Sequence, residues 1–225
     1  MIKTGLWVKM GIMLLLFSHI SCMQNKPSGQ ELIPAVNAYS FSDLLSARDS
    51  RNNEQVYTWF NLIDWCAENG VKALDMTAYF FPSYPEVPSD EYLAGLKNYA
   101  SEKGVVINGT GIRNDFASPD STIRAEGLQL AKNWIVAASK LGAPVLRVFA
   151  GPVPEGHEWE EVAGWMIACY KELAAFGEKY NVKIGVQNHG DMLQTADQCK
   201  YVLDRVNSEQ VGLILDTGSF KTEDP

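Results

Sequence analysis

Polar side chains that could transfer protons or hold a ligand stand in three β-rich runs of the sequence. Gln187 and His189 close one run, Asp216 lies at the end of the next, and Asp75 lies in an earlier one. Residues two positions apart on a strand point to the same face, so Gln187 and His189 share a face by parity. An imidazole titrates near neutral pH, which makes His189 a candidate catalytic acid or base. A hydrogen-bonded structural histidine is the alternative that the sequence leaves open.

A second set of polar residues is suited to holding a substrate. Arg147 is a charge inside an otherwise apolar run, and a charge in such a place requires a partner. That partner is either an anionic or hydroxyl-rich substrate or the carboxylate of Asp75 in an internal salt bridge. Asn114 follows one run and Asn188 lies beside His189, so both offer donors and acceptors near the same strand ends. The predicted substrate-binding residues are Arg147, Asn114, Asn188 and Asp75.

These residues belong to a regular alternation of two kinds of segment. Runs rich in β-branched and aromatic residues alternate with stretches whose apolar residues recur at helical spacing. In the third helical stretch Leu128, Ile135 and Ala138 share one face, and Gly142 followed by Pro144 ends the helix. Strand starts lie about 35 residues apart, which predicts parallel strands joined by right-handed crossovers. The predicted strands are 35–41, 73–79, 105–112, 145–151, 182–189 and 211–218.

Two architectures of the α/β class fit this alternation, a doubly wound open sheet and a (β/α)8 barrel. The first predicted strand is not followed by a GxGxxG loop, which disfavours a dinucleotide-binding doubly wound sheet. Polar side chains gathered at the C-terminal ends of the strands favour a barrel, which keeps its chemistry at that rim. We therefore predict a TIM-barrel-type domain over residues 34–225 with about six of the eight βα units. Because full barrels run to roughly 250 residues, we expect a truncated chain with two exposed sheet edges.

The N-terminal residues resemble a targeting signal. Lys3 and Lys9 precede a short apolar run at 10–17, which is too short to span a bilayer comfortably. A basic region followed by a short apolar one is typical of a signal peptide. We therefore predict a signal peptide over residues 1–21 and an exported protein.

The end of this signal resembles a bacterial lipobox. Ile20-Ser21-Cys22 fits the motif, in which the cysteine is diacylated and becomes the mature N-terminus, although His19 replaces the usual Leu or Val. The polar stretch that follows suits a flexible tether over 22–33. We predict lipidation at Cys22 and a membrane-anchored lipoprotein in the periplasm or on the cell surface. An ordinary cleaved signal with a coincidental cysteine is the alternative.

Composition excludes several classes of protein. Apolar residues make up 46% of the chain, which is enough for a sizeable core and rules out a disordered chain. The 27 acidic residues outnumber the 19 basic ones, and this balance argues against a nucleic-acid partner. Beyond Cys22 the cysteines number three and lie in helical patterns, so they do not form a disulfide scaffold.

Three of the predicted strands carry motifs of a known family. The stretch VKIGVQNHGD (182–191), followed by GLILDTGS (212–219), resembles strands five and six of the xylose isomerase-like sugar isomerase/epimerase superfamily, which also contains endonuclease IV. The stretch GAPVLRVFAG (142–151) is similar to strand four of that superfamily. The resemblance covers the sequence from about residue 34 onward and implies a TIM barrel whose active site lies at the C-terminal mouth.

The resemblance also implies a divalent cation, Mn²⁺, Mg²⁺ or Co²⁺. Members of the superfamily hold it with a Glu of strand five, an Asp of strand six, and a His and a Glu of strands seven and eight. Asp216 corresponds to the strand-six ligand, with a helix-capping aspartate as the alternative. Gln187 stands in place of the strand-five Glu, and its oxygen can bind a metal but brings no charge and cannot act as a base. The remaining two ligands would follow Pro225.

The implied function is isomerisation or epimerisation of a sugar or keto-sugar by metal-assisted proton transfer through an enediolate. An uncharged sugar is favoured for an exported protein because phosphorylated sugars are mostly retained inside cells. Gln187 supports an alternative, a sugar-binding lipoprotein with the same barrel that has lost catalysis. An endonuclease IV-like function is disfavoured because Ser219 stands where that relative has a His.

Two loops and one polar cluster would complete a sugar cleft. The segments 79–85 and 151–159 are rich in aromatic residues, and the second contains His157 and Trp159. Aromatic rings pack against the apolar face of a sugar, but they also cover the ends of barrels. The cluster at 113–116 offers further donors and acceptors at the same rim.

Overall fold

The computed structural model of the protein describes residues 33–220. The predicted signal peptide at 1–21, Cys22 and all but the last residue of the predicted tether lie outside this range. Within it, no helix is both long enough and apolar enough to cross a membrane.

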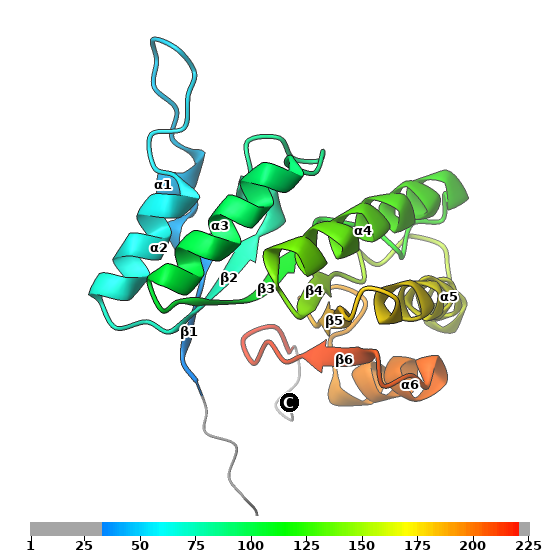
Figure 1. Cartoon of the computed structure of the whole chain (residues 1–225). Helices are drawn as coiled ribbons and strands as arrows, with labels where there is room; N and C mark the ends of the chain where they lie inside the picture. The colour runs from blue at the N-terminus through cyan, green and yellow to red at the C-terminus, as the bar shows by residue number, and fades with distance from the viewer. Residues whose placement is uncertain (1–32, 221–225) are drawn as a thin grey trace, which may run out of the picture. The chain divides into compact units, whose positions relative to one another are not determined.

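Six parallel strands form one sheet, and their order in the sheet is their order in the chain. A doubly wound sheet reverses its strand order at a switch point, whereas neighbouring strands of a barrel follow one another. The sheet therefore has the topology of six consecutive units of a (β/α)8 TIM barrel, as predicted (Figure 1). The strands are β1 (Ala35–Asn37), β2 (Ala73–Thr77), β3 (Val106–Gly111), β4 (Val145–Val148), β5 (Lys183–Gln187) and β6 (Val211–Ile214).

Helices connect the strands, and each of the long ones packs against the next along the chain. Thr58 and Thr195 each begin a helix with a capping box, in which side chains satisfy backbone N–H groups that lack helical partners. Gly142 ends α4 with a φ of 78°, a left-handed conformation that favours glycine, as the sequence predicts. The helices are α1 (Ser42–Ser46), α2 (Trp59–Glu68), α3 (Asp90–Glu102), α4 (Ser121–Leu141), α5 (Trp159–Glu178) and α6 (Ala196–Val206), with 3₁₀ turns η1 (Ala38–Phe41) and η2 (Ala78–Phe80).

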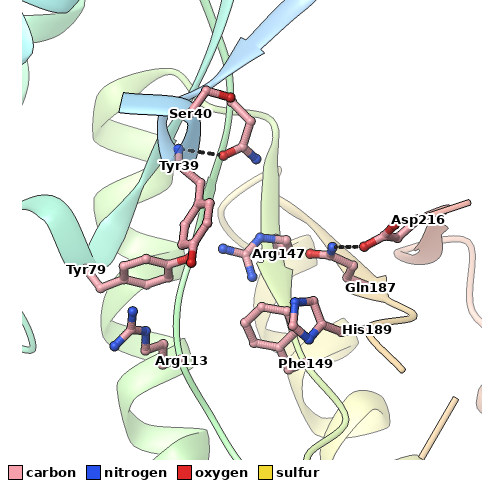
Figure 2. A pocket seen from close by; sticks show the side chains of 10 residues that line it. Tyr39, Ser40, Tyr79, Arg113, Arg147, Phe149, Gln187, His189 and Asp216 are labelled. Carbon is pink, nitrogen blue, oxygen red and sulfur yellow. Dashed lines mark hydrogen bonds between the residues drawn. The ribbon is translucent and has the colours of Figure 1, made fainter. Parts of the chain in front are cut away.

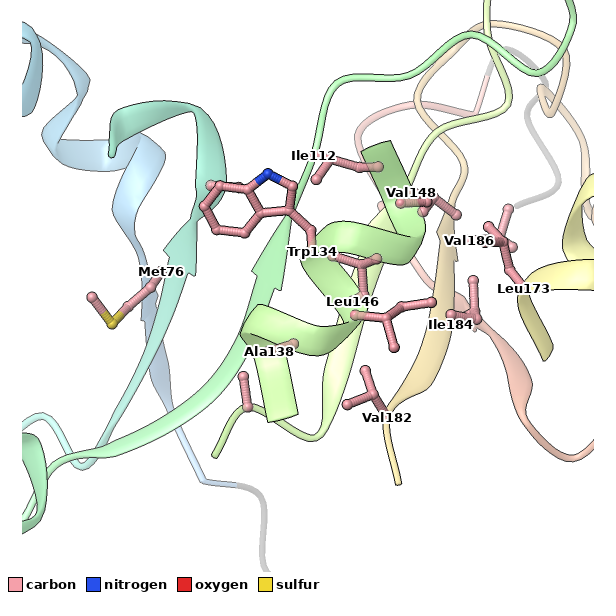
Figure 3. Packing of buried hydrophobic residues seen from close by; sticks show 14 of the residues in the cluster. Met76, Ile112, Trp134, Ala138, Leu146, Val148, Leu173, Val182, Ile184 and Val186 are labelled. Atoms are coloured by element: carbon pink, nitrogen blue, oxygen red, sulfur yellow. The ribbon is translucent and has the colours of Figure 1, made fainter. Parts of the chain in front are cut away.

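The main core lies between the sheet and the helices that cover it. Figure 3 shows Leu146 of β4 and Ile184 of β5 in this layer, close to side chains of α4 and α5. Trp134 of α4 is fully buried, and its indole N–H donates to the carbonyl oxygen of Pro85 at 3.0 Å, so its polar atom is satisfied. This packing holds β3, β4 and β5 in place and thereby fixes the residues that follow them.

The two outer strands are less covered than the central ones. Among residues 33–220, β1 pairs only with β2, and β6 pairs only with β5. Ala35 and Asn37 of β1 and Gly212 of β6 are exposed, whereas Leu146 and Ile184 of the central strands are fully buried. The described part of the sheet thus has the two open edges that the sequence analysis predicts.

Candidate functional site

A cavity of about 500 Å³ opens at the C-terminal ends of the strands. The strands end one to four residues earlier than predicted, so most of the lining residues lie just past the strands, on loops or 3₁₀ turns. Figure 2 shows these side chains converging from segments that are far apart in the sequence. The lining residues are Asn37, Tyr39, Ser40, Tyr79, Arg113, Arg147, Phe149, Gln187, His189 and Asp216.

Asp216 forms the acidic side of the cavity, and each of its carboxylate oxygens accepts at least one hydrogen bond. Gln187 Nε2 donates to Oδ2 at 3.0 Å, Ser219 Oγ donates to Oδ2 at 2.9 Å, and the backbone N–H of Gly218 donates to Oδ1 at 3.1 Å. Burial acts to raise the pKa of Asp216, but these hydrogen bonds and the nearby charge of His189 outweigh it and lower the pKa. Asp216 therefore stays ionised at neutral pH.

The fit of these residues to a divalent cation is poor. Gln187 turns its amide nitrogen, rather than its oxygen, toward Asp216. The amide oxygen of Gln187 is the atom that could bind a cation, and with the nitrogen on Asp216 it does not face the carboxylate with which it would share the ion. In residues 33–220 there is no group of three or more His, Cys, Asp or Glu side chains placed to hold a metal. The described residues therefore do not form a metal site by themselves, and Asp216 is the one acidic group of the cavity lining.

His189 lines the same cavity as Gln187, as parity predicts. The residue is exposed, and its ring lies edge-on to Phe149 with 4.8 Å between ring centroids. An exposed imidazole in a cavity can reach both a ligand and water, which are the two partners that a proton-transfer group requires.

Arg147 forms the basic side of the cavity and is 4% exposed. Its guanidinium carbon lies 4.4 Å from the ring centroid of Phe149 and 5.9 Å from that of Tyr79. Gly111 makes room for it, since a Cβ on Gly111 would lie 2.5–2.6 Å from three guanidinium atoms. Within the described chain the guanidinium donates no hydrogen bond, and Nη1 is buried without a partner.

Asp75 does not form the salt bridge with Arg147 that the sequence analysis left open. None of the described ion pairs joins these two residues, although the positive charge of Arg147 acts to lower the pKa of Asp75. Thr77 Oγ1 donates to Asp75 Oδ1 at 3.3 Å. Burial raises the pKa of Asp75 despite the opposing effects of Arg147 and Thr77. Asp75 is absent from the cavity lining, so this placement does not support a direct substrate contact.

Asn114 and Asn188 hold strand ends together instead of facing the cavity. Asn188 is fully buried, donates to the carbonyl of Asp216 at 2.8 Å and accepts from its N–H at 2.8 Å. Asn114 makes the same pair of bonds with the backbone of Phe149, at 2.8 and 2.9 Å. Their amide groups extend the parallel pairing beyond the ends of the strands. The predicted substrate contacts of both asparagines therefore do not fit their placement, because their polar atoms are already paired.

The aromatic walls differ from the predicted ones. Tyr79 lines the cavity, but His157 pairs with Glu161 at 3.1 Å and Trp159 donates to the carbonyl of Met192 at 2.9 Å, so neither contributes to the lining. Tyr39 also lines the cavity, and it lies in η1, directly after the edge strand β1. The sequence patterns above do not single out this residue or its neighbours Asn37 and Ser40, although all three lie within the first predicted strand (35–41), as most of the other lining residues lie within theirs.

Together the topology and the cavity define a parallel α/β barrel domain with a polar, aromatic-walled pocket at its C-terminal rim. A family model described as the xylose isomerase-like TIM barrel matches residues 63–223. The chain belongs to this family.

Solved structures support the same fold. The chain is similar to D-psicose 3-epimerase determined in the presence of D-fructose, with 18% identity, a TM-score of 0.66 and coverage of 81% of this chain and 63% of that one. It is also similar to D-psicose 3-epimerase with D-tagatose from Clostridium cellulolyticum H10, with 16% identity, a TM-score of 0.68 and coverage of 85% and 66%. A third similar structure is the IolI protein with a binding zinc atom, with 19% identity, a TM-score of 0.63 and coverage of 83% and 63%.

The chain therefore spans less than two thirds of the length of each of these three structures. No curated protein sequence matches it significantly. At these identities the structural similarity establishes the fold and leaves the reaction to be argued from the site.

Proposed function

We propose that the chain binds a sugar or keto-sugar in this cavity and isomerises or epimerises it by proton transfer through an enediolate. The observation that carries the proposal is that Gln187, His189, Asp216 and Arg147 line one cavity at the barrel rim. The first two structural neighbours, which are named as D-psicose 3-epimerases, support the reaction class.

His189 is the group that we assign to proton transfer. It is the one histidine in the cavity lining, and it is exposed to a ligand. Moving a proton from the carbon beside a carbonyl requires a base near that carbon and an acid near the oxygen. Neutral imidazole can take the carbon-bound proton. In an isomerisation its protonated form returns that proton to the former carbonyl carbon, while solvent water protonates the carbonyl oxygen and takes the proton of the neighbouring hydroxyl. In an epimerisation a water on the opposite face returns a proton to the same carbon, and the imidazolium releases its own proton to solvent.

Asp216 and Gln187 have supporting parts in this proposal. The ionised Asp216 accepts hydrogen bonds from three donors and places a negative charge near His189. A negative charge there interacts attractively with the positive charge that the ring carries once it has taken the proton. Metal ligation by Asp216 and Gln187 stays a prediction, and because the described residues do not fit a cation, no step of the reaction is assigned to one.

The proposal is tested with the full chain on a panel of aldoses and ketoses, with products separated by chromatography. We expect conversion of at least one sugar, and His189→Asn should lower kcat by about 10²- to 10⁴-fold. The matched control is His157→Asn, because His157 lies outside the cavity lining and pairs with Glu161. Equal activity of His189→Asn and the wild type would refute the assignment of His189.

A second candidate function is sugar binding without catalysis. The observation that favours it is the amide of Gln187, which cannot act as a base and instead donates to Asp216. Calorimetry that detects sugar binding, together with no turnover of the bound sugar, would favour this function over the first.

We further propose that the protein is exported and anchored to a membrane through a lipid at Cys22. Support comes from the sequence alone, namely the basic and short apolar run before Ile20-Ser21-Cys22. Labelled fatty acid should be incorporated into the wild type and not into Cys22→Ser, and the wild type should sediment with membranes. Equal incorporation into both proteins would contradict the anchor.

A further inference from the structure

The guanidinium of Arg147 is a buried cation whose donors have no acceptor in the described chain. Arg147 is 4% exposed, and Nη1 is one of few buried side-chain atoms there without a hydrogen-bond partner. A buried polar group without a partner costs free energy, and a charged one costs more than a neutral one. An acceptor supplied by a ligand in the cavity would remove that cost.

The place of Arg147 is built by its neighbours. Phe149 stacks beneath the guanidinium at 4.4 Å, and the bare backbone of Gly111 lies where a Cβ would come within 2.6 Å of it. Aromatic rings and a glycine hold the planar group without using its N–H donors. The donors are therefore oriented and still free to bind.

A second arginine faces the same cavity. Arg113 is exposed, and its guanidinium lies 4.2 Å from the ring centroid of Tyr79, which is also within 5.9 Å of Arg147. No carboxylate of residues 33–220 forms an ion pair with either arginine. The cavity lining thus holds two arginines and a single acid, Asp216, although the whole chain has a net charge of −8.

Neither of the two nearby carboxylates, Asp216 and Asp75, accepts a described hydrogen bond from Arg147 or Arg113. Among the described residues, the side chains and backbone that donate to the Asp216 carboxylate are Gln187, Ser219 and Gly218, and neither arginine donates to it. Asp75 accepts from Thr77 and makes no hydrogen bond with Arg147. The N–H groups of Arg147 are therefore available to donate to an anion that enters the cavity.

We propose that the substrate is a sugar that carries an oxyanion group, a carboxylate or a phosphate, held by Arg147 and Arg113. This inference rests on the proposed function, because it takes the ligand of the cavity to be a sugar. A guanidinium offers parallel N–H donors that match two oxygens of a carboxylate or phosphate, whereas a neutral hydroxyl matches them poorly. The proposal of an anionic sugar replaces the uncharged sugar that is favoured above on the basis of the sequence.

The test is calorimetric titration of the full chain with three ligands that differ only at one carbon: D-glucose, D-glucuronate and D-glucose 6-phosphate. The D-galactose series is titrated in the same way. We expect the carboxylate or the phosphate ligand of at least one series to bind about tenfold or more tightly than its neutral parent. The stronger of the two anionic ligands identifies the source of the oxyanion.

Variants locate the effect. Arg147→Gln should abolish the preference for the anionic ligand, Arg147→Lys should retain part of it, and Arg113→Gln should reduce it severalfold. The matched control is Arg205→Gln, because Arg205 stacks on Tyr201 of α6 and lies outside the cavity lining. If Arg147→Gln does not fold, Arg113→Gln decides the question, because Arg113 is exposed.

The outcomes separate this inference from the proposed function. Equal binding of neutral and anionic sugars, or an undiminished preference in folded Arg147→Gln, would overturn the inference while turnover that depends on His189 would still support the function. A preference that is lost in Arg147→Gln, with no turnover of any sugar, would support the inference and contradict the reaction. If none of the six sugars binds, the inference is overturned.

Discussion

The two sides of the cavity handle their charges in opposite ways. On the β6 side the carboxylate of Asp216 accepts three hydrogen bonds from its own chain. On the β4 side the guanidinium of Arg147 is held by rings and by the space above Gly111, and it donates no hydrogen bond within the described residues. One charge is satisfied inside the protein, and the other is positioned but unsatisfied.

This difference shows how ligand chemistry can be inferred from a site. A polar group whose bonding capacity is used within the fold stabilises the fold, whereas an oriented group with free donors is available to a ligand. The family resemblance points to Asp216 as the ligand-holding charge of the cavity. The hydrogen bonds point instead to Arg147 as the group with the most capacity to bind.

The largest expected effect concerns the asparagines that support the two sides. Asn188→Ala leaves the backbone N–H and carbonyl of Asp216 unpaired and should lower the free energy of unfolding by about 3 kcal/mol. Asn114→Ala should cost about 2 kcal/mol at Phe149, because Asn114 is less buried. Urea denaturation measures both. Asn133→Ala is the control, because Asn133 is exposed and its side chain forms a described hydrogen bond only with the side chain of Gln129. If Asn188→Ala lowers the free energy of unfolding no more than this control does, the supporting role of Asn188 is contradicted.

The next effect concerns the space for Arg147. Gly111→Ala places a Cβ against the guanidinium and should lower the free energy of unfolding by about 2 kcal/mol, while also weakening anionic ligands. Gly212→Ala on β6 is the matched control, because its Cβ would meet no atom within 4 Å. If both variants are equally stable in thermal denaturation, Arg147 does not depend on Gly111.

A smaller effect is expected on the affinity for a metal ion at the side of the cavity that carries Asp216. Gln187→Glu adds a second carboxylate beside Asp216, so the pair should bind Mn²⁺ about tenfold more tightly than the wild type, a gain of about 1.4 kcal/mol. Titration calorimetry with MnCl₂ measures the change. Gln129→Glu, at an exposed position of α4, serves as the control for added negative charge. Unchanged affinity in Gln187→Glu would show that the two side chains cannot share a cation.

The smallest effect is a pH dependence of stability. The pKa of Asp216 is lowered in the folded state, so its contribution to stability is present above the unfolded pKa of about 3.9 and is lost as pH falls through the folded pKa. The stability difference between the wild type and Asp216→Asn should therefore shrink on acidification below about pH 4.

Asp191 provides the opposite case. Burial raises its pKa, against hydrogen bonds from the N–H groups of Gly151 and Leu193, so its contribution is present at low pH and is lost as pH rises through the folded pKa. The stability of Asp191→Asn should therefore increase relative to that of the wild type as pH rises above about 4. Parallel pH profiles of the two variants would contradict these assignments.

Much of the fold could be predicted from the sequence because its signals are local. The spacing of apolar runs and stops such as Gly142 predicts strands and helices at their observed places, and polar strand ends predict the barrel rim. The predicted strand ends lie one to four residues too late, because residues at the rim keep β-like composition after the ladder has ended.

The site could be predicted only in part. Parity brings Gln187 and His189 to one face, and parity also places Asn188 on the other face, which is a signal that could have excluded it from the cavity. Nothing local shows that the amide of Asn114 pairs with the backbone of Phe149, some 35 residues away in sequence. Tyr39 reaches the cavity only through the curvature of the whole sheet, which a strand-by-strand analysis does not contain.

The most direct test of the proposed reaction is the incorporation of deuterium from D₂O into a sugar bound by the full chain, followed by proton NMR at the carbon beside the carbonyl. Proton transfer through an enediolate exchanges that hydrogen with solvent even where little product accumulates. We predict exchange with the wild type and His157→Asn, and a loss of about 10²-fold or more with His189→Asn. Tight sugar binding by the wild type without any exchange at that carbon would contradict the proposed chemistry.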